Sequence, residues 1–205
     1  SKFGKVAVVT KSSLTDCNTD HAQGGIAAAI DPKDSFAAHI EDTYQAGAEL
    51  GKKQVISEII SSAPQLIQYL IDLGTDFTLR DPAYDICLEN LSLTMEGGHT
   101  RRRIAYAADS TGHQIMEALI AQCRKNANID IFEYRIAIDL ITQHHVVQDE
   151  GFVPGISCWG AYVLETKENK VDIFKARKTM LATGGAAQIY SPNTNPKVTT
   201  GDGMA

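Results

Sequence analysis

The chain has 205 residues, a formal net charge of −6 and an apolar fraction of 43%, which fits one globular domain or a large part of one. The negative balance argues against a nucleic-acid surface, which needs a broad positive patch. The four cysteines form no CxxC pair, and no apolar run approaches the length of a membrane span, so neither a zinc ribbon nor a membrane protein is predicted. With no signal peptide, a cytoplasmic protein is expected.

The first half of the chain predicts one strand followed by helices. The β-branched run after Gly4 is typical of a buried strand. Ser35 can cap a helix with an apolar face, and Pro64 is well placed in the first turn of another helix. The expected elements are a strand over 5–11, a loop over 12–25, and helices over 36–50, 54–62 and 64–73.

The second half predicts one helix and then mainly strands. Asp109 or Ser110 can cap the helix, and the later apolar runs are strand-like. The expected elements are a helix over 111–126 and strands over 129–134, 136–141, 157–165 and 170–182. This order predicts an α/β layer domain with a mixed sheet.

Two adjacent glycines in the stretch NTDHAQGGIAAAI, residues 18–30, raise the possibility of a ligand cradle. Glycine lets a ligand approach the main chain with no Cβ in the way, and successive backbone N–H groups form an anion-binding concavity. The alternative is a tight turn that leads into a close-packed segment. The spacing alone leaves both interpretations open.

A second candidate is LTMEGGHTRRR, residues 93–103, where Glu96 stands beside two glycines and can be aimed into a cleft. The three arginines that follow could grip a carboxylate or phosphate, because a guanidinium fork matches an oxyanion in a bidentate way. The alternative is a solvated, charged loop.

Three further patterns could carry chemistry. LATGG, residues 181–185, resembles a buried strand that ends at the ligand-binding edge of an α/β sheet, and Gly201-Asp202-Gly203 can expose its carboxylate. Both also fit ordinary turns. His144 and His145 are adjacent, and neighbours on a strand point to opposite faces, so they rarely share one metal ion. They are interpreted as solvent-exposed loop residues. No metal site is predicted.

Taken together and in this order, these segments resemble the FAD-binding domain of the L-aspartate oxidase family, within the succinate dehydrogenase/fumarate reductase flavoproteins. NTDHAQGGIAAAI is similar to the glycine-rich flavin segment, and DSFAAHIEDTYQAGA to the helix after it. LTMEGGHTRRRIAYAADSTG is similar to a segment that marks aspartate oxidases. LATGGAAQIYSPNTNP and TTGDGMA match later flavin-contacting stretches.

The resemblance implies a set of site residues. Glu96 matches the family glutamate that orients the amino group of the substrate beside the flavin, and is the expected catalytic residue. The basic triplet is at most a supporting site. The implied FAD-binding residues are Lys11, Asn18, Thr19, Asp20, His21, Ala22, Gln23, Gly24, Gly25, Thr183, Gly184 and Asp202.

Three departures from the family pattern qualify this assignment. Asn18 stands where the dehydrogenases carry a histidine bonded to the flavin, so noncovalent FAD is expected. Met95 replaces a common arginine. The family's first strand and its GxGxxG turn, which receives the pyrophosphate, are not in this sequence. Residues 1–205 are therefore expected to be a partial, Rossmann-like FAD-binding domain with additional β-strands, without the capping and C-terminal helical domains.

The implied parent activity is oxidation of L-aspartate to iminoaspartate, the first step of quinolinate and NAD synthesis. Oxygen or fumarate would accept the electrons, and quinolinate synthase is a possible pathway partner. No nucleic acid or membrane partner is expected. We expect these 205 residues alone to have little or no oxidase activity. Two alternatives remain: a fumarate reductase or succinate dehydrogenase flavoprotein, and a non-catalytic flavin-binding remnant.

Overall fold

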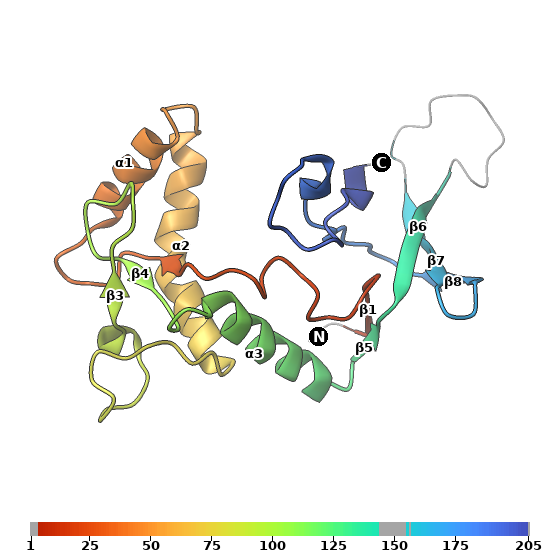
Figure 1. The fold of residues 1–205 in the computed structure, drawn as a ribbon, viewed down its shortest axis with the longest axis horizontal. Coiled ribbons are helices and arrows are strands. Elements are labelled where there is room, and N and C mark those ends of the chain that lie inside the picture. The colour runs from red at the N-terminus through yellow and green to blue at the C-terminus, as the bar shows by residue number, and fades with distance from the viewer. Residues whose placement is uncertain (1–3, 144–154, 156, 205) are drawn as a thin grey trace. The chain divides into compact units, whose positions relative to one another are not determined.

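The computed structural model describes residues 4–143, 155 and 157–204 (Figure 1). His144 and His145 lie outside the described residues. The fold combines helices with parallel and antiparallel strands, which confirms the predicted α/β class. The chain divides into two compact units. We call Thr19–Gln122 the helical unit, and Ser1–Asn18 with Cys123–Ala205 the sheet unit.

The helical unit packs two helices against a small sheet. Helix α1 (Phe36–Ala46) lies beside α2 (Lys53–Asp72) (Figure 1). Strand β4 (Ile104–Ala105) is central and pairs antiparallel with both β2 (Ile26–Ala27) and β3 (Leu93–Thr94). The core of this unit is apolar, as its burial from water requires, and consists of Ala28, Ala63, Ile67, Ile71, Phe77, Leu91 and Ala105.

Helix α1 begins where predicted but ends earlier. The Ser35 side chain accepts a hydrogen bond from the backbone N–H of Ala38 and so caps the helix. The helix stops at Ala46 because Ala48 and Glu49 adopt left-handed backbone angles. Phe36, the first residue of the helix, is exposed, and His39 is its buried residue.

Helix α2 corrects the prediction of two short helices that meet at Pro64. It is one continuous helix, and Pro64 lies inside it. A proline in a helix interior removes one backbone hydrogen bond. The helix continues because its buried stripe of Ile60, Ala63, Ile67 and Ile71 spans both sides of the proline. Gly74, with φ at +100°, follows the helix end as predicted.

Helix α3 (Thr111–Lys125) agrees with its predicted range within one residue. The Thr111 hydroxyl is buried and accepts a hydrogen bond from the backbone N–H of Ala107. Met116 and Ile120 lie on its buried face. The helix belongs to the helical unit up to Gln122, and its last turn is counted with the sheet unit.

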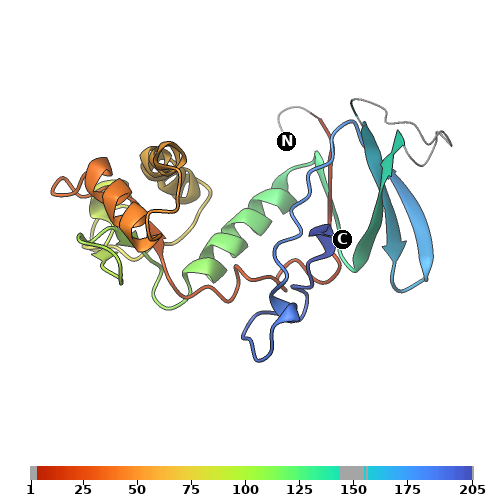
Figure 2. The same ribbon diagram turned by 90° about the horizontal axis from the view of Figure 1, so that it is seen from above.

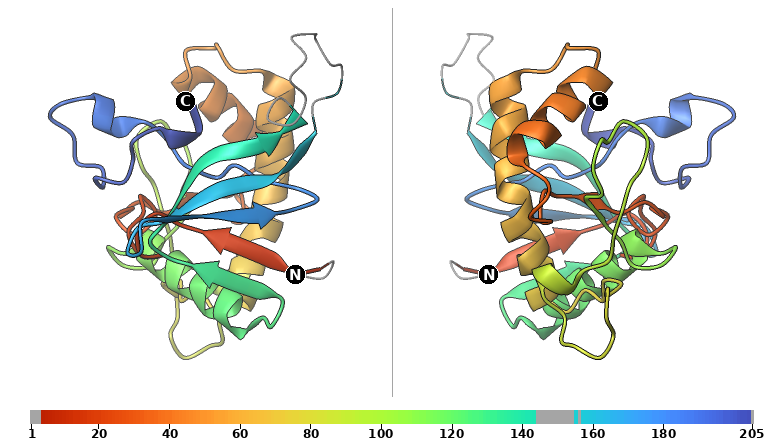
Figure 3. Two further views of the ribbon diagram at one scale, coloured as in Figure 1. Left: turned by 90° about the vertical axis from the view of Figure 1, so that its right-hand side faces the viewer. Right: turned by 90° about the vertical axis from the view of Figure 1, so that its left-hand side faces the viewer.

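The sheet unit contains a parallel pair and an antiparallel meander (Figure 3). Strand β1 (Val6–Val9) pairs in parallel with β5 (Ile129–Phe132). The meander has the order β6 (Arg135–Thr142), β7 (Cys158–Glu165) and β8 (Lys170–Lys175). Phe132 and Phe174 join the two sheets edge to face, with ring centroids 4.9 Å apart.

Two strand predictions need correction. Strand β1 is not buried, since Val6 is 41% exposed. Strand β8 ends at Lys175, whereas the prediction extended it to residue 182. Met180 is 89% and Leu181 54% exposed, and in the described part of the chain no strand pairing reaches them. The backbone groups of a strand need hydrogen-bond partners on a neighbouring strand. An apolar composition alone therefore did not extend β8 to residue 182.

The segment after β8 has little regular structure. It carries two short 3₁₀ helices, η3 (Ala187–Ile189) and η4 (Asp202–Met204) (Figure 2). A backbone bond from the Gly201 N–H to the Gly185 carbonyl brings the two glycine-containing motifs of this segment together.

Candidate functional site

The predicted flavin loop, residues 19–25, is anchored on the start of α3. The backbone N–H of Gly112 donates to the Ala22 carbonyl at 2.9 Å. A Cβ at Gly112 would lie 2.8 Å from the Ala22 Cβ, and would also clash with the Thr19 carbonyl oxygen. The bare backbone of Gly112 therefore lets the loop lie directly on the helix.

An exposed ion pair adds a second anchor to this loop. The Asp20 carboxylate lies 2.6 Å from Nδ1 of His113. The hydrogen bond to Asp20 raises the pKa of His113 above its ordinary value. His113 thus ties the start of α3 to the flavin loop.

The two adjacent glycines have different roles. A Cβ at Gly25 would lie 2.5 Å from Cγ2 of Ile104 and would clash with the Ala105 carbonyl oxygen. Gly25 is thus required by close packing of the loop on β4, which is the turn-and-packing alternative weighed in the sequence. Gly24 is exposed, and the nearest atom to a Cβ built there is Oε1 of Glu96, at 3.8 Å.

Glu96 therefore stands beside the flavin loop although 72 residues separate it from Gly24 in sequence. The common strand β4 causes this, because β2 follows the loop and β3 precedes Glu96, and both pair with β4. Glu96 and Gly97 are exposed, and a Cβ at Gly97 would meet no atom within 4 Å. The structure thus brings the glycine pair and the Glu96 motif together, although they are separate in the sequence.

The three arginines after Glu96 do not form one oxyanion grip. Arg101 and Arg102 are exposed, whereas Arg103 is fully buried. Arg103 donates to the carboxylates of Asp34 and Asp42 on the α1 side of the unit. The solvated-loop interpretation therefore describes the first two arginines, and Arg103 is a buried ion-pair residue.

A second group of predicted site residues lies in the sheet unit. Lys11 Nζ lies 2.5 Å from an Asp202 carboxylate oxygen and 2.5 Å from the Thr200 hydroxyl. Hydrogen bonds from Lys11 and then Thr200 lower the pKa of Asp202. Sequence reasoning missed Thr200, although its place two residues before Asp202 in TTGDG could have indicated it.

The predicted residues Asn18, Thr183 and Gly184 belong to the same unit as this pair. Thr183 packs against Gly203, where a Cβ would lie 3.2 Å from the Thr183 Cβ and would clash with its hydroxyl. The Thr199 hydroxyl donates to the Asn18 side-chain oxygen at 3.4 Å. A Cβ at Gly184 would meet no atom within 4 Å.

These residues fit the requirements of FAD. The cofactor offers ribose hydroxyls, phosphates and a flat ring. The Lys11–Asp202 pair supplies a donor and an acceptor suited to hydroxyl groups, and exposed main chain at Gly24 and Gly184 offers surface without a Cβ. Each unit therefore separately offers groups whose chemistry suits part of the cofactor.

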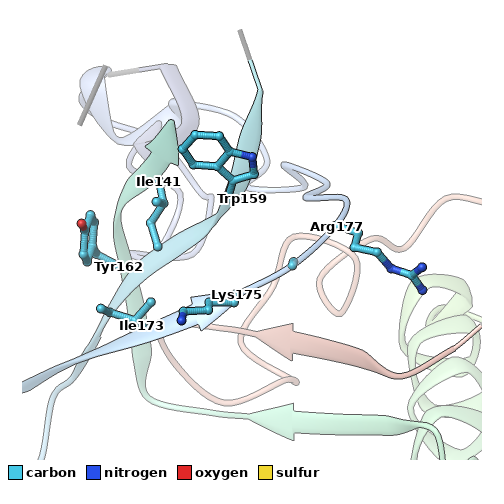
Figure 4. A pocket seen from close by; sticks show the side chains of 7 residues that line it. Ile141, Trp159, Tyr162, Ile173, Lys175 and Arg177 are labelled. Atoms are coloured by element: carbon cyan, nitrogen blue, oxygen red, sulfur yellow. The ribbon is translucent and has the colours of Figure 1, made fainter. Parts of the chain in front are cut away.

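The described residues also include a hollow of about 460 Å³ in the sheet unit (Figure 4). Ile141, Tyr162 and Ile173 give it an apolar wall, and Lys175 and Arg177 carry its cations. Trp159 lies at the same hollow. None of the predicted site residues lines it, so it is a feature separate from the candidate site.

The described residues contain neither a metal-binding cluster nor a membrane-spanning helix. No group of three or more His, Cys, Asp and Glu residues is arranged to hold a metal ion there. No helix in the same part of the chain is long and apolar enough to cross a membrane.

Comparison with known proteins assigns the family. The family described as "FAD binding domain" matches residues 2–205. The chain belongs to this FAD-binding domain family, and the prediction of FAD as the cofactor is confirmed at that level.

Among curated relatives, the chain is similar to several L-aspartate oxidases. It is 41% identical to that of Acinetobacter baylyi over 98% of this chain and 35% of the relative. It is 39% identical to that of Pseudomonas aeruginosa over 98% of this chain and 37% of the relative. It is 39% identical to the chloroplastic L-aspartate oxidase of Arabidopsis thaliana over 100% of this chain and 30% of the relative. The chain thus spans about a third of the length of these relatives.

Among solved structures, the chain is similar to a fumarate reductase chain and to a chain of an Sdh1 complex. An E. coli quinol fumarate reductase chain matches with a TM-score of 0.85 and 27% identity, over 99% of this chain and 32% of that chain. A chain of the Mycobacterium smegmatis Sdh1 complex matches with a TM-score of 0.81 and 28% identity, over 97% of this chain and 33% of that chain.

Proposed function

We propose that this chain is the FAD-binding part of an enzyme that oxidises L-aspartate to iminoaspartate. The observation that carries the proposal is the position of Glu96, whose carboxylate lies beside the exposed Gly24 of the flavin loop. Identity to named L-aspartate oxidases reaches 41%, against 27% and 28% for the fumarate reductase and Sdh1 chains. This difference favours aspartate over succinate or fumarate as the substrate.

The proposed residue roles follow from the chemistry of each side chain. The Lys11–Asp202 pair binds cofactor hydroxyls, and the Gly24 main chain and the Thr183–Gly184 segment contact the cofactor. The remaining loop residues proposed to line FAD are Asn18, Thr19, Asp20, His21, Ala22, Gln23 and Gly25. Asn18 carries no nucleophilic nitrogen, so the cofactor is held noncovalently.

Glu96 is proposed to bind the ammonium group of L-aspartate. A bound FAD would supply the acceptor for the hydride equivalent from the substrate Cα, while a proton would leave the substrate nitrogen as the C=N bond forms. The carboxylate fixes the amino group through charge-assisted hydrogen bonds, which in proteins contribute roughly 1.5–3 kcal/mol.

Oxygen or fumarate is proposed as electron acceptor, with quinolinate synthase as pathway partner and the cytoplasm as location.

Replacement of Glu96 by glutamine tests the proposal. Glu96→Gln removes the charge and keeps the shape, so we expect the affinity for L-aspartate, measured by calorimetry with FAD present, to fall by roughly 10- to 100-fold. The affinity for succinate, which has no ammonium group, should change little. Glu89→Gln, an exposed glutamate of the same unit, is the matched control. Equal losses for both ligands would contradict the assigned role.

A further inference from the structure

We propose that Arg103 is the positioning residue of the Glu96 loop, and that it acts through Asp42 and Thr100. The inference rests on the proposed function, because it concerns how the substrate-binding carboxylate is held. The loop, residues 95–102, leaves β3 and returns into β4. Its exposed Gly97 and Gly98 add backbone freedom, so a fixed carboxylate requires ties from outside the loop.

The first tie is the guanidinium itself. Arg103 donates from Nε and Nη2 to the two oxygens of Asp34, at 2.7 and 2.9 Å. Its Nη1 donates to Asp42 at 2.6 Å. The guanidinium fork therefore binds two carboxylates at once. A lysine has no planar fork and could not reproduce this geometry. The Arg103 side chain is 0% exposed.

The second tie connects this ion pair to the loop. The same Asp42 oxygen accepts hydrogen bonds from the Thr100 backbone N–H at 2.9 Å and from its hydroxyl at 2.8 Å. His99 Nδ1 lies 3.3 Å from Nη1 of Arg103. A guanidinium can only donate, so this nitrogen accepts. The loop is thus held on its C-terminal side by contacts that converge on one arginine.

The backbone of Arg103 also closes the base of the loop. Its N–H donates to the Thr94 carbonyl at 3.1 Å, and its carbonyl accepts from the N–H of Ala28 at 2.8 Å. Ala28 follows β2, the strand that leaves the flavin loop. One residue therefore links the strand before Glu96 with the strand that follows the flavin loop.

The electrostatics of the cluster explain why its geometry is fixed. Burial alone would raise the pKa of Asp34, but the hydrogen bond from Arg103, the hydrogen bond from the Ser35 backbone and the charge of Arg103 together outweigh burial and lower this pKa. Burial, then Arg103, lowers the pKa of the neighbouring His39. The cluster thus holds one cation between two carboxylates. Loss of a partner would leave a buried charge uncompensated, which is strongly destabilising.

The test removes the side-chain part of the link between Asp42 and the loop, keeps the backbone hydrogen bond from Thr100, and leaves the ion pair intact. Thr100→Val deletes the hydroxyl that bonds to Asp42, and Thr100→Ser keeps it. Thr43→Val is a matched control on α1, where the hydroxyl donates to the His39 carbonyl. We expect amide hydrogen exchange of residues 97–102 to rise roughly three- to tenfold in Thr100→Val and to stay unchanged in the other two. Unchanged exchange in Thr100→Val would overturn the inference.

A binding measurement separates positioning from general stability. In Thr100→Val the affinity for L-aspartate should fall by a similar factor, while FAD affinity and melting temperature stay at the values of Thr100→Ser. A melting temperature that falls with the affinity would overturn the positioning role. If exchange responds as expected but the unaltered protein binds no L-aspartate, the loop anchor stands and the proposed function fails.

Arg103→Lys provides an independent second variant. It keeps the charge but loses the fork, so we expect faster exchange in residues 97–102 together with a lower melting temperature. A variant that melts lower but keeps native exchange in the loop would contradict the inference, because Arg103 would then support the fold without holding the loop.

Discussion

At the scale of single residues, Gly24 and Gly25 show that one motif can combine two causes. The sequence presented them as one bare-backbone feature. The structure assigns Gly25 to packing on β4 and leaves only Gly24 exposed beside Glu96. A short-range pattern could not separate the two glycines, because the atoms that crowd Gly25 come from residues about 80 positions away.

This difference predicts opposite outcomes for two neighbouring substitutions. Gly25→Ala should lower the free energy of unfolding by more than about 2 kcal/mol, because the new Cβ meets backbone that cannot move aside. Gly24→Ala should change it by less than about 1 kcal/mol. Urea unfolding of both variants measures this, and equal losses would show that the two positions are packed alike.

His113 and Asp20 give a pH-dependent contact at the flavin loop. The folded-state pKa of His113 is raised by Asp20, so the stabilising contribution is fully present below the unfolded histidine pKa of about 6.5. It is lost as pH rises through the higher folded-state value. Because both side chains are accessible to solvent, the contribution to stability is small.

We predict that NMR titration of the His113 ring gives a pKa above 6.5 in the unaltered chain, and a lower value in Asp20→Asn. His21, on the same loop, serves as the internal reference. A His113 titration curve that is identical in the two proteins would show that the ion pair does not form in solution.

At the scale of secondary-structure elements, local patterns located most helices and strands but not their limits. The Ser35 cap placed the start of α1, and the residue range of α3 was matched within one residue. Pro64 misled the prediction because a local breaker was weighed without the apolar stripe around it. The expected strand up to residue 182 failed for a related reason, since a strand also depends on a partner edge that composition does not reveal.

Pro64 therefore offers a direct test of the continuous helix. Pro64→Ala restores the missing backbone donor inside α2, so we predict an increase in the free energy of unfolding of about 1–3 kcal/mol. Greater freedom of the unfolded chain offsets part of that gain. Chemical denaturation provides the measurement, and a value at or below that of the unaltered chain would mean that α2 is broken at residue 64.

At the scale of the whole molecule, sequence motifs predicted the cofactor family and most of the candidate site, while the contacts that hold the site came only from the structure. Glu96 and the Lys11–Asp202 pair were predicted one residue at a time. The buried cluster of Arg103 with Asp34 and Asp42 was not, because charged residues ordinarily indicate a solvated surface. Arg103 lies more than 60 residues from each of the two carboxylates in sequence.

The central claim is that this chain presents a surface for FAD, with Gly24 as its exposed main chain. Equilibrium dialysis of the chain against FAD tests this most directly, with Gly24→Val and, as control, the exposed Ala83→Val. The account predicts saturable binding near one FAD per chain, weakened at least about tenfold by Gly24→Val, which corresponds to about 1.4 kcal/mol, and unaffected by Ala83→Val. Absence of saturable binding, or equal affinity in all three proteins, would contradict it.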